Sequence, residues 1–224
     1  GELASNYSLA NDSLASTITA KALAVTAPSI ADKVYDGQVT AGAVTVGTLS
    51  GFVGTETVTA TGAAANYSSA NVGSYSSAVS YTLANGLNGG LAGNYSLAAG
   101  TATGTITAKA LTMTGSSVAA SKVYDGNRTA VVTVGALSGE VTGETLGTTT
   151  VVGTYNSKDV LAANTVTAVY TLVNGANGEL ASNYSLANDN LASTITAKDL
   201  TVVGTTVTAK AYDGNTTATL AGST

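Results

Sequence analysis

The chain has 224 residues and a net charge of −5, and it contains neither cysteine nor histidine. Disulfides therefore do not hold it together, and a catalytic triad, a thiol nucleophile and a zinc site are excluded in their usual forms. Only 9% of the residues are charged while 44% are hydrophobic, which is unlike a disordered chain, and without a basic run we expect no nucleic-acid partner.

The sequence repeats with a period of 88 to 89 residues. KVYDG occupies residues 33–37 and 122–126, and KAYDG occupies residues 210–214. NYSL and TITAK recur with the same spacing. A fixed period indicates a repeat architecture, and this one is the size of a small domain, whereas a solenoid coil takes ~20–50 residues.

This period divides the chain into four parts. We expect the C-terminal end of a truncated repeat in residues 1–20, complete repeats in 21–108 and 109–197, and the start of a further truncated repeat in 198–224. We also expect the chain to be a section of a longer protein.

The first complete repeat has the pattern of β-strands. Val79, Tyr81 and Leu83 alternate with small or polar residues, which predicts a half-buried strand. The segment from Leu91 to Leu97 alternates in the same way, and an Asn-Gly turn signal lies between the two. We therefore expect two sequential antiparallel strands here, with counterparts in the second repeat.

Shorter strand-like runs follow near residues 44–49, 56–61, 132–137 and 144–149, so that each repeat has roughly seven strands. The fold class predicted is all-β, with tandem immunoglobulin-like β-sandwich modules of about 88–89 residues. No stretch is typical of an amphipathic helix, and none is apolar enough to span a membrane.

The Tyr-Asp-Gly motif is best interpreted as a tight turn. Glycine accepts a positive φ without steric cost, and the preceding tyrosine can bury its ring. A calcium site built from the aspartate is the weaker alternative, because calcium needs six or more oxygens and no acidic loop is present. The turn residues are Tyr35, Asp36, Gly37, Tyr124, Asp125, Gly126, Tyr212, Asp213 and Gly214.

The TITAKAL motif predicts a module junction. Its isoleucine and leucine are five residues apart, so one straight strand would place them on opposite faces. We expect the isoleucine to close one module and the leucine to open the next, with a short stiff linker that makes the array an elongated rod. The junction residues are Ile18, Lys21, Leu23, Ile106, Lys109, Leu111, Ile195, Lys198 and Leu200.

These motifs resemble a known family. Lys122–Ala130, the NYSL segments and the TITAKAL boundaries are similar to the YDG-type repeats, related to the MBG repeats, of very large secreted bacterial surface proteins. Many such proteins are filamentous-haemagglutinin-like adhesins. The resemblance covers essentially the whole chain and implies an extracellular or cell-surface location, and it supplies no catalytic residue. Gln38 departs from the asparagine at this point of the motif.

Two modifications are candidates. Asn-x-Ser/Thr acceptor sequences for glycosylation occur at Asn6, Asn11, Asn66, Asn94, Asn127, Asn183 and Asn215, although a chain rich in Asn, Ser and Thr produces them by chance. The second candidate modification is an isopeptide bond between a lysine and an asparagine. The simpler interpretation is that these lysines are exposed on strands and discourage aggregation at sheet edges.

Two function classes follow. The first is a structural stalk or filament whose partners are copies of itself, end to end in the chain or side by side in a fibre. The second is an adhesin module that binds glycans or cell-surface proteins, for which Tyr67, Tyr75 and Tyr155 lie in the least similar part of the repeat. We expect no enzyme activity, no cofactor and no metal site, because the sequence has no phosphate loop, dinucleotide fingerprint or paired-carboxylate motif.

Overall fold

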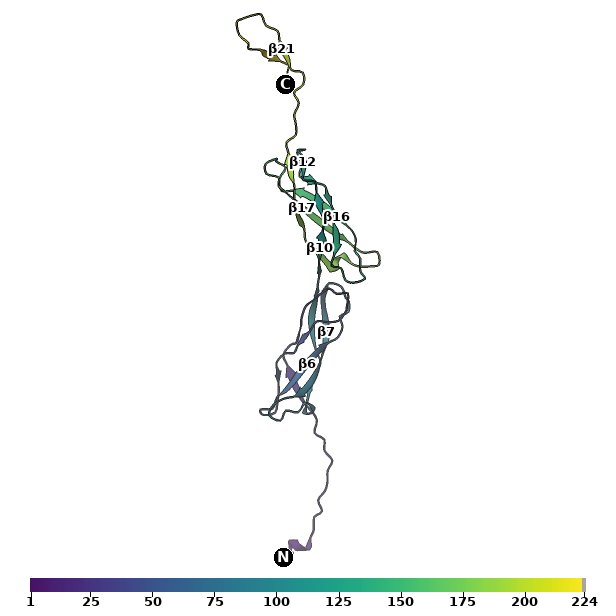
Figure 1. Cartoon of the computed structure of the whole chain (residues 1–224). Helices are drawn as coiled ribbons and strands as arrows, with labels where there is room; N and C mark the ends of the chain where they lie inside the picture. The colour runs from purple at the N-terminus through teal and green to yellow at the C-terminus, as the bar shows by residue number, and fades with distance from the viewer. Residues whose placement is uncertain (223–224) are drawn as a thin grey trace. The chain divides into compact units, whose positions relative to one another are not determined.

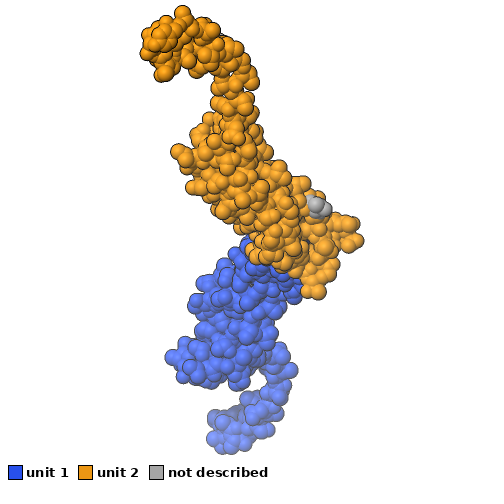
Figure 2. Space-filling view, turned by 45° about the horizontal axis from the view of Figure 1, so that its top comes forward, with its two compact units in different colours: residues 1–109, 182–184 blue, residues 110–181, 185–224 orange. Residues whose placement is uncertain are grey.

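The computed structural model describes residues 1–222, except for the side chain of Thr148, and this part of the chain contains no α-helix. It divides into two compact units, shown in different colours in Figure 2. Unit 1 comprises residues 1–109 and 182–184, and unit 2 comprises residues 110–181 and 185–224. The prediction of an all-β fold is confirmed.

Unit 1 contains three sheets. Two strands of the largest sheet, β6 (Val58–Ala64) and β7 (Gly73–Asn85), lie side by side in Figure 1. One sheet has the order β5 (Leu49–Ser50), β1 (Lys21–Val25), β8 (Tyr95–Leu97). The largest has the order β3 (Lys33–Val34), β9 (Gly100–Thr107), β7 (Gly73–Asn85), β6 (Val58–Ala64). The third pairs β2 (Ser29–Ile30) with β4 (Val44–Thr45).

The second repeat has corresponding sheets. The orders are β15 (Ala136–Ser138), β10 (Lys109–Thr114), β18 (Tyr184–Leu186) and β13 (Thr129–Ala130), β16 (Gly147–Tyr155), β17 (Thr165–Val173), β19 (Asp189–Ala192). Two-stranded pairs join β11 (Ser117–Val118) to β14 (Val132–Thr133) and β12 (Ser121–Val123) to β20 (Thr194–Thr196). Near the C-terminus, β21 (Thr206–Thr208) pairs with β22 (Thr219–Ala221).

The long strands follow the predicted alternation. In β7, Ser77 and Val79 are buried while Ala78 and Ser80 are exposed. In β17, alternate residues from Val166 to Tyr170 are buried. Such alternation arises because successive side chains of a strand point to opposite faces of the sheet.

The prediction that the next segment pairs with β7 is wrong. The strand β8 is short and pairs in parallel with β1, whereas β7 pairs with β6 and β9. A 3-10 turn, η2 (Ala92–Asn94), precedes β8, and the side chain of Asn85 accepts a hydrogen bond from the Ala92 N–H at 2.8 Å. Asn85 therefore holds a connection to another sheet and is not part of a two-residue hairpin.

The same arrangement occurs in the second repeat. The side chain of Asn174 accepts a hydrogen bond from the Ala181 N–H at 2.9 Å, which begins the turn η3 (Ala181–Asn183). A similar short turn, η1 (Ala4–Asn6), lies near the N-terminus. The repeats also contain more strands than the roughly seven expected, because the runs at 44–49 and 132–137 each form two short strands and further short strands lie outside the predicted runs.

Each repeat buries a small apolar core. Leu23, Val58 and Tyr95 form a cluster in the first repeat. Ala130, Tyr155, Ala163, Val166 and Ile195 form one in the second. Tyr155, which the sequence pattern did not place, belongs to this core, since only 1% of it is exposed and its hydroxyl is hydrogen-bonded to that of Ser193 at 2.7 Å.

Tyr67, the counterpart of Tyr155, is also buried, so neither tyrosine of the variable stretch is accessible to a ligand. Its ring stacks on that of Tyr75 with centroids 5.4 Å apart. Tyr75 is half-buried and its hydroxyl donates to the Asn71 carbonyl oxygen. These three tyrosines serve the packing of the repeats.

The segments outside the two repeats pack against little. Residues 1–20 contain no strand, and residues 198–222 contain only the pair β21 and β22. Ile18, Leu200 and Tyr212 are almost fully exposed, unlike their buried or half-buried counterparts in the complete repeats. Their side chains remain in solvent because no sheet among the described residues covers these segments.

Candidate functional site

The Tyr-Asp-Gly loop has the same geometry at all three places. Gly37, Gly126 and Gly214 have φ of 78°, 84° and 78°. The aspartate before each glycine accepts a hydrogen bond from the backbone N–H two residues later, at 2.9 to 3.1 Å. Such a side-chain turn stabilises the reversal of the chain, and the positive φ explains why glycine follows the aspartate.

A lysine three residues before the aspartate completes the loop. Lys122 Nζ donates to Asp125 Oδ1 (2.9 Å), to both oxygens of Asn127 (2.9 and 3.0 Å) and to the Thr129 carbonyl oxygen (3.0 Å). The ammonium also lies 5.3 Å from the centroid of the Tyr155 ring. One cation thus links the loop to the core of its repeat.

In the other copies the lysine also pairs with the aspartate and donates to oxygens of the loop. Lys33 pairs with Asp36 at 2.7 Å and donates to the carbonyl oxygens of Gln38 and Thr40. Lys210 pairs with Asp213 at 2.8 Å and with Asn215. The sequence shows lysines at these landmarks, but their spacing did not predict that the ammonium groups bind the oxygens of the loop.

The carboxylates of these loops have lowered pKa values. The hydrogen bond from Lys122 is the main cause for Asp125, and Lys210 acts likewise on Asp213. Burial raises the pKa of Asp36, but the hydrogen bonds from Lys33 and from the Gln38 N–H lower it by more, so this pKa also falls. The three loops therefore keep their ion pairs at neutral pH.

These contacts suit a structural loop better than a metal site. Within residues 1–222 no group of three or more acidic side chains could hold a metal ion. The lysine ammonium already binds the oxygens of the loop. Lys122 Nζ lies 2.9 Å from Asn127 Oδ1, so this pair is the nearest candidate for an isopeptide bond in the second repeat. The isopeptide bond stays a hypothesis that intact mass tests, because each bond releases one ammonia.

The junction residues of the central TITAKAL motif lie in consecutive strands. Ile106 in β9 is fully buried in unit 1, and Leu111 in β10 is 4% exposed in unit 2. Only Ala108 lies between these strands. Lys109, the last residue of the first part of unit 1, is half-buried.

In each outer copy of the motif, one of the two apolar residues is buried and the other is exposed. Leu23 and Ile195 belong to the cores of the two repeats, whereas Ile18 and Leu200 are exposed. Lys21 and Lys198 are exposed as well.

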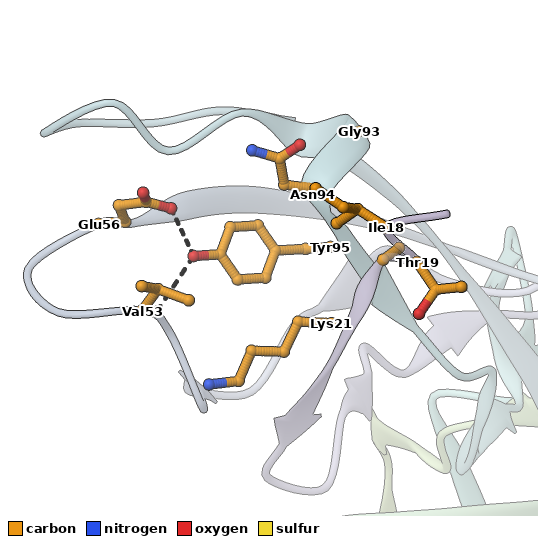
Figure 3. A pocket seen from close by; sticks show the side chains of 9 residues that line it. Ile18, Thr19, Lys21, Val53, Glu56, Gly93, Asn94 and Tyr95 are labelled. Atoms are coloured by element: carbon orange, nitrogen blue, oxygen red, sulfur yellow. Dashed lines mark hydrogen bonds between the residues drawn. The ribbon is translucent and has the colours of Figure 1, made fainter. Parts of the chain in front are cut away.

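A small pocket of about 340 Å³ lies beside Tyr95 in unit 1. Figure 3 shows the Tyr95 hydroxyl between Glu56 and Val53, with the side chain of Lys21 extending on the same side. The hydroxyl donates to Glu56 Oε2 at 2.6 Å and accepts from the Val53 N–H at 3.1 Å. The hydrogen bond to Glu56 raises the pKa of Tyr95.

Residues 182–184, far from the rest of unit 1 in sequence, cover another part of its surface. Asn183 is 1% exposed, and its side-chain amide accepts from the Val72 N–H and donates to Asn71 Oδ1, both at 2.9 Å. The Tyr184 ring meets that of Tyr35 edge to face, with centroids 5.3 Å apart. No pattern in the sequence predicted this contact, and Asn183 was expected only as a possible glycosylation acceptor.

Burial makes Asn183 unsuitable for glycosylation in the folded chain, so this prediction is wrong. A glycan needs an accessible side-chain amide, and that of Asn183 is enclosed and hydrogen-bonded. The other six acceptor asparagines are exposed: Asn6, Asn11, Asn66, Asn94, Asn127 and Asn215.

The fold and the recurring loop define the class of this protein as a tandem array of all-β repeats. The chain belongs to the YDG domain family, whose YDG domain matches residues 19–103 and again residues 107–191. The resemblance to YDG-type repeats is thereby confirmed. No curated protein and no solved structure matches the chain. No helix in the described part of the chain is long and apolar enough to cross a membrane.

Proposed function

We propose that this chain is part of the structural repeat region of a large extracellular bacterial surface protein. Its YDG domains act as immunoglobulin-like sandwiches that follow one another in a stiff rod or fibre. The observation that carries the proposal is the direct connection of the two matched repeats. Only Ala108 separates β9 from β10, and Ile106 and Leu111 on either side of it are buried. Such a connection has none of the freedom of a Gly/Ser linker.

The core of the first repeat supports a sandwich. Leu23 of one sheet and Val58 of another belong to one buried cluster, as expected where two sheets pack face to face. The first strands of the repeat also pair in parallel with its last strands, β1 with β8 and β3 with β9. Backbone hydrogen bonds thereby join the first strands of the repeat directly to its last strands. This arrangement suits a domain that is pulled at both ends of its chain.

The alternative function, an adhesin module that binds glycan or protein, has less support. Two tyrosines of the variable region, Tyr67 and Tyr155, are in the core and form no platform for a ligand. Glycan sites usually present aromatic side chains in a concave surface with convergent polar groups.

Spin labels at matched exposed positions test the stiffness. Thr82→Cys in β7 and Thr171→Cys in β17 introduce two thiols into a chain without cysteine. We expect a narrow distribution of distances between the labels in pulsed dipolar spectroscopy. Insertion of Gly-Ser-Gly-Ser after Ala108 is the control and should broaden it. A native distribution as broad as that of the insertion variant would contradict the rod.

The location is tested separately. Antibodies against the chain should label intact cells of the source organism without permeabilisation. Labelling only after permeabilisation would overturn the extracellular location and leave the stiffness of the repeats to be decided by the spin labels.

A further inference from the structure

The surface that residues 182–184 cover in unit 1 has a counterpart in unit 2. Tyr124 corresponds to Tyr35 through the repeated KVYDG motif, and Asp159 and Val160 follow Asn71 and Val72 by 88 residues. In unit 2 these residues line an apolar pocket of about 410 Å³ together with Ala197, Lys198 and Leu200. We call Tyr124, Asp159 and Val160 the docking surface.

The docking surface has unused binding capacity. Among the described residues nothing accepts a hydrogen bond from the Val160 N–H, whereas the Val72 N–H donates to Asn183. The Asp159 carboxylate is largely exposed, and within residues 1–222 its ion pair is with the neighbouring Lys158, at 3.3 Å. Leu200 is 89% exposed, although its counterparts Leu23 and Leu111 are buried.

We infer that the docking surface binds the Asn-Tyr-Ser-Leu segment of another copy of the repeat, and that residues 6–9 of a second molecule of this chain can supply it. These residues have the same sequence as residues 183–186. They are exposed, with 69% of Tyr7 and 96% of Leu9 accessible. This inference is independent of the proposed function, because it concerns recognition between repeats wherever they occur.

The contacts in unit 1 define the chemistry of the complex. The Val160 N–H donates to the side-chain oxygen of Asn6, and the amide nitrogen of Asn6 donates to the Asp159 carboxylate. The Tyr7 ring packs edge to face on Tyr124, as Tyr184 packs on Tyr35. A carboxylate is a stronger acceptor than the amide oxygen of Asn71 that it replaces.

The pairing of β1 with β8 gives the register of the adjoining strands. There Lys21 lies opposite Tyr95 and Leu23 opposite Leu97. The same register places Lys198 opposite Tyr7 and Leu200 opposite Leu9. Residues 198–200 then form a strand in the complex. The side chains of Leu9 and Leu200, both exposed in the free chain, become buried against each other, which favours binding.

A labelled peptide of residues 3–14 tests the inference. The receptor is the full chain with Asn6→Ala and Tyr7→Ala, so that its own segment does not compete. We expect saturable binding by fluorescence anisotropy, together with slower hydrogen exchange in residues 198–203. A peptide with Asn6→Ala should bind about tenfold or more weakly, because the Asp159 carboxylate and the Val160 N–H lose their partner.

Two receptor variants locate the site. Asp159→Ala changes an exposed side chain and should weaken binding about as much as the peptide variant does. Asn71→Ala is the matched control in unit 1 and should leave binding unchanged, because Asn183 already occupies that surface. Absence of saturable binding, equal binding by Asp159→Ala, or a loss caused equally by Asn71→Ala would each overturn the inference.

Discussion

Single side chains fix the Tyr-Asp-Gly loop without help from the rest of the fold. The loop at residues 210–215 has the same ion pair and the same glycine φ as the other two, although Tyr212 is 96% exposed. The lysine, aspartate and glycine are close in sequence, so their contacts form locally. The loop therefore keeps its geometry whether or not its tyrosine is packed in a core.

The first prediction concerns Gly126. We expect Gly126→Val to destabilise unit 2 by about 1–3 kcal/mol, because a β-branched residue is strained at φ 84°. No atom lies within 4 Å of the added Cβ, so the backbone and not a clash causes the loss. Gly126→Asn is the control and should cost less, since asparagine tolerates this region.

Hydrogen exchange on the full chain measures this effect, with unit 1 as the internal reference. If the amides of unit 2 exchanged equally slowly in the valine variant and in the native chain, the positive φ of residue 126 would not require glycine.

The second prediction concerns the pH dependence of the same loop. Because the folded pKa of Asp125 is lowered, its ion pair contributes stability above the unfolded pKa, and this contribution is lost as pH falls through the folded value. Carbon-detected NMR titration of Asp125 should give a pKa below that of an unfolded aspartate. Lys122→Met should raise it towards that value. An identical titration in both proteins would refute the role of the lysine.

Strands of equivalent sequence are not fully equivalent in the two repeats. The continuous strand β9 corresponds to two strands, β19 and β20, which are separated by Ser193. Gly104 occupies the place of Ser193 in the first repeat and lies against the Tyr67 hydroxyl. In the second repeat the Ser193 hydroxyl contacts that of Tyr155 and donates to the Ala119 carbonyl oxygen, each at 2.7 Å. The two repeats thus accommodate the same tyrosine by different means.

Substitutions at these two positions form the third prediction. Ser193→Ala should destabilise unit 2 by about 1–3 kcal/mol, because it removes a buried hydrogen-bond partner. Gly104→Ala should destabilise unit 1 by a similar amount, about 1–3 kcal/mol, because the new methyl group overlaps the Tyr67 hydroxyl. Urea unfolding followed by NMR signals of each unit measures both. A neutral Gly104→Ala would mean that Tyr67 moves aside without cost.

The fourth prediction concerns β9 and β10, which meet at Ala108. Ile106→Ala should cost about 2–4 kcal/mol in unit 1, and Leu111→Ala a similar amount in unit 2, as large-to-small changes in a core do. Hydrogen exchange read unit by unit separates the effects. If either substitution loosens both units equally, the array unfolds as one cooperative body and the division into modules is wrong.

At the scale of the whole chain, the two repeats are flanked by segments with few contacts. Residues 1–20 are exposed throughout, and so are residues 198–222. Apart from the pair β21 and β22 and the loop between these strands, this backbone is neither paired nor buried, so it opens with little free-energy cost and is accessible to proteases.

Limited proteolysis provides the fifth prediction. Elastase, which cuts after small residues, should first remove parts of residues 1–19 and 199–222 and leave a resistant fragment that holds both repeats. Intact-mass spectrometry over time identifies the fragments. Early cleavage near Ala108, which lies between two buried strands, would contradict the short, ordered connection.

The sequence by itself determined the features that depend on neighbouring residues or on a period. The repeat length, the all-β class, the alternation in β7 and β17 and the positive φ of the Asp-Gly loops were all predictable, because strand pleating and turn geometry are local. The tertiary structure alone decided the contacts between distant segments.

These distant contacts include the pairing of β8 with β1, the burial of Tyr67 and Tyr155, and the enclosure of Asn183 by residues more than a hundred positions earlier. An asparagine followed by Tyr-Ser has the same local pattern at positions 94 and 183, and it is exposed at one and buried at the other. The difference lies in what packs on each residue, and packing partners are not encoded by the spacing of residues along the chain.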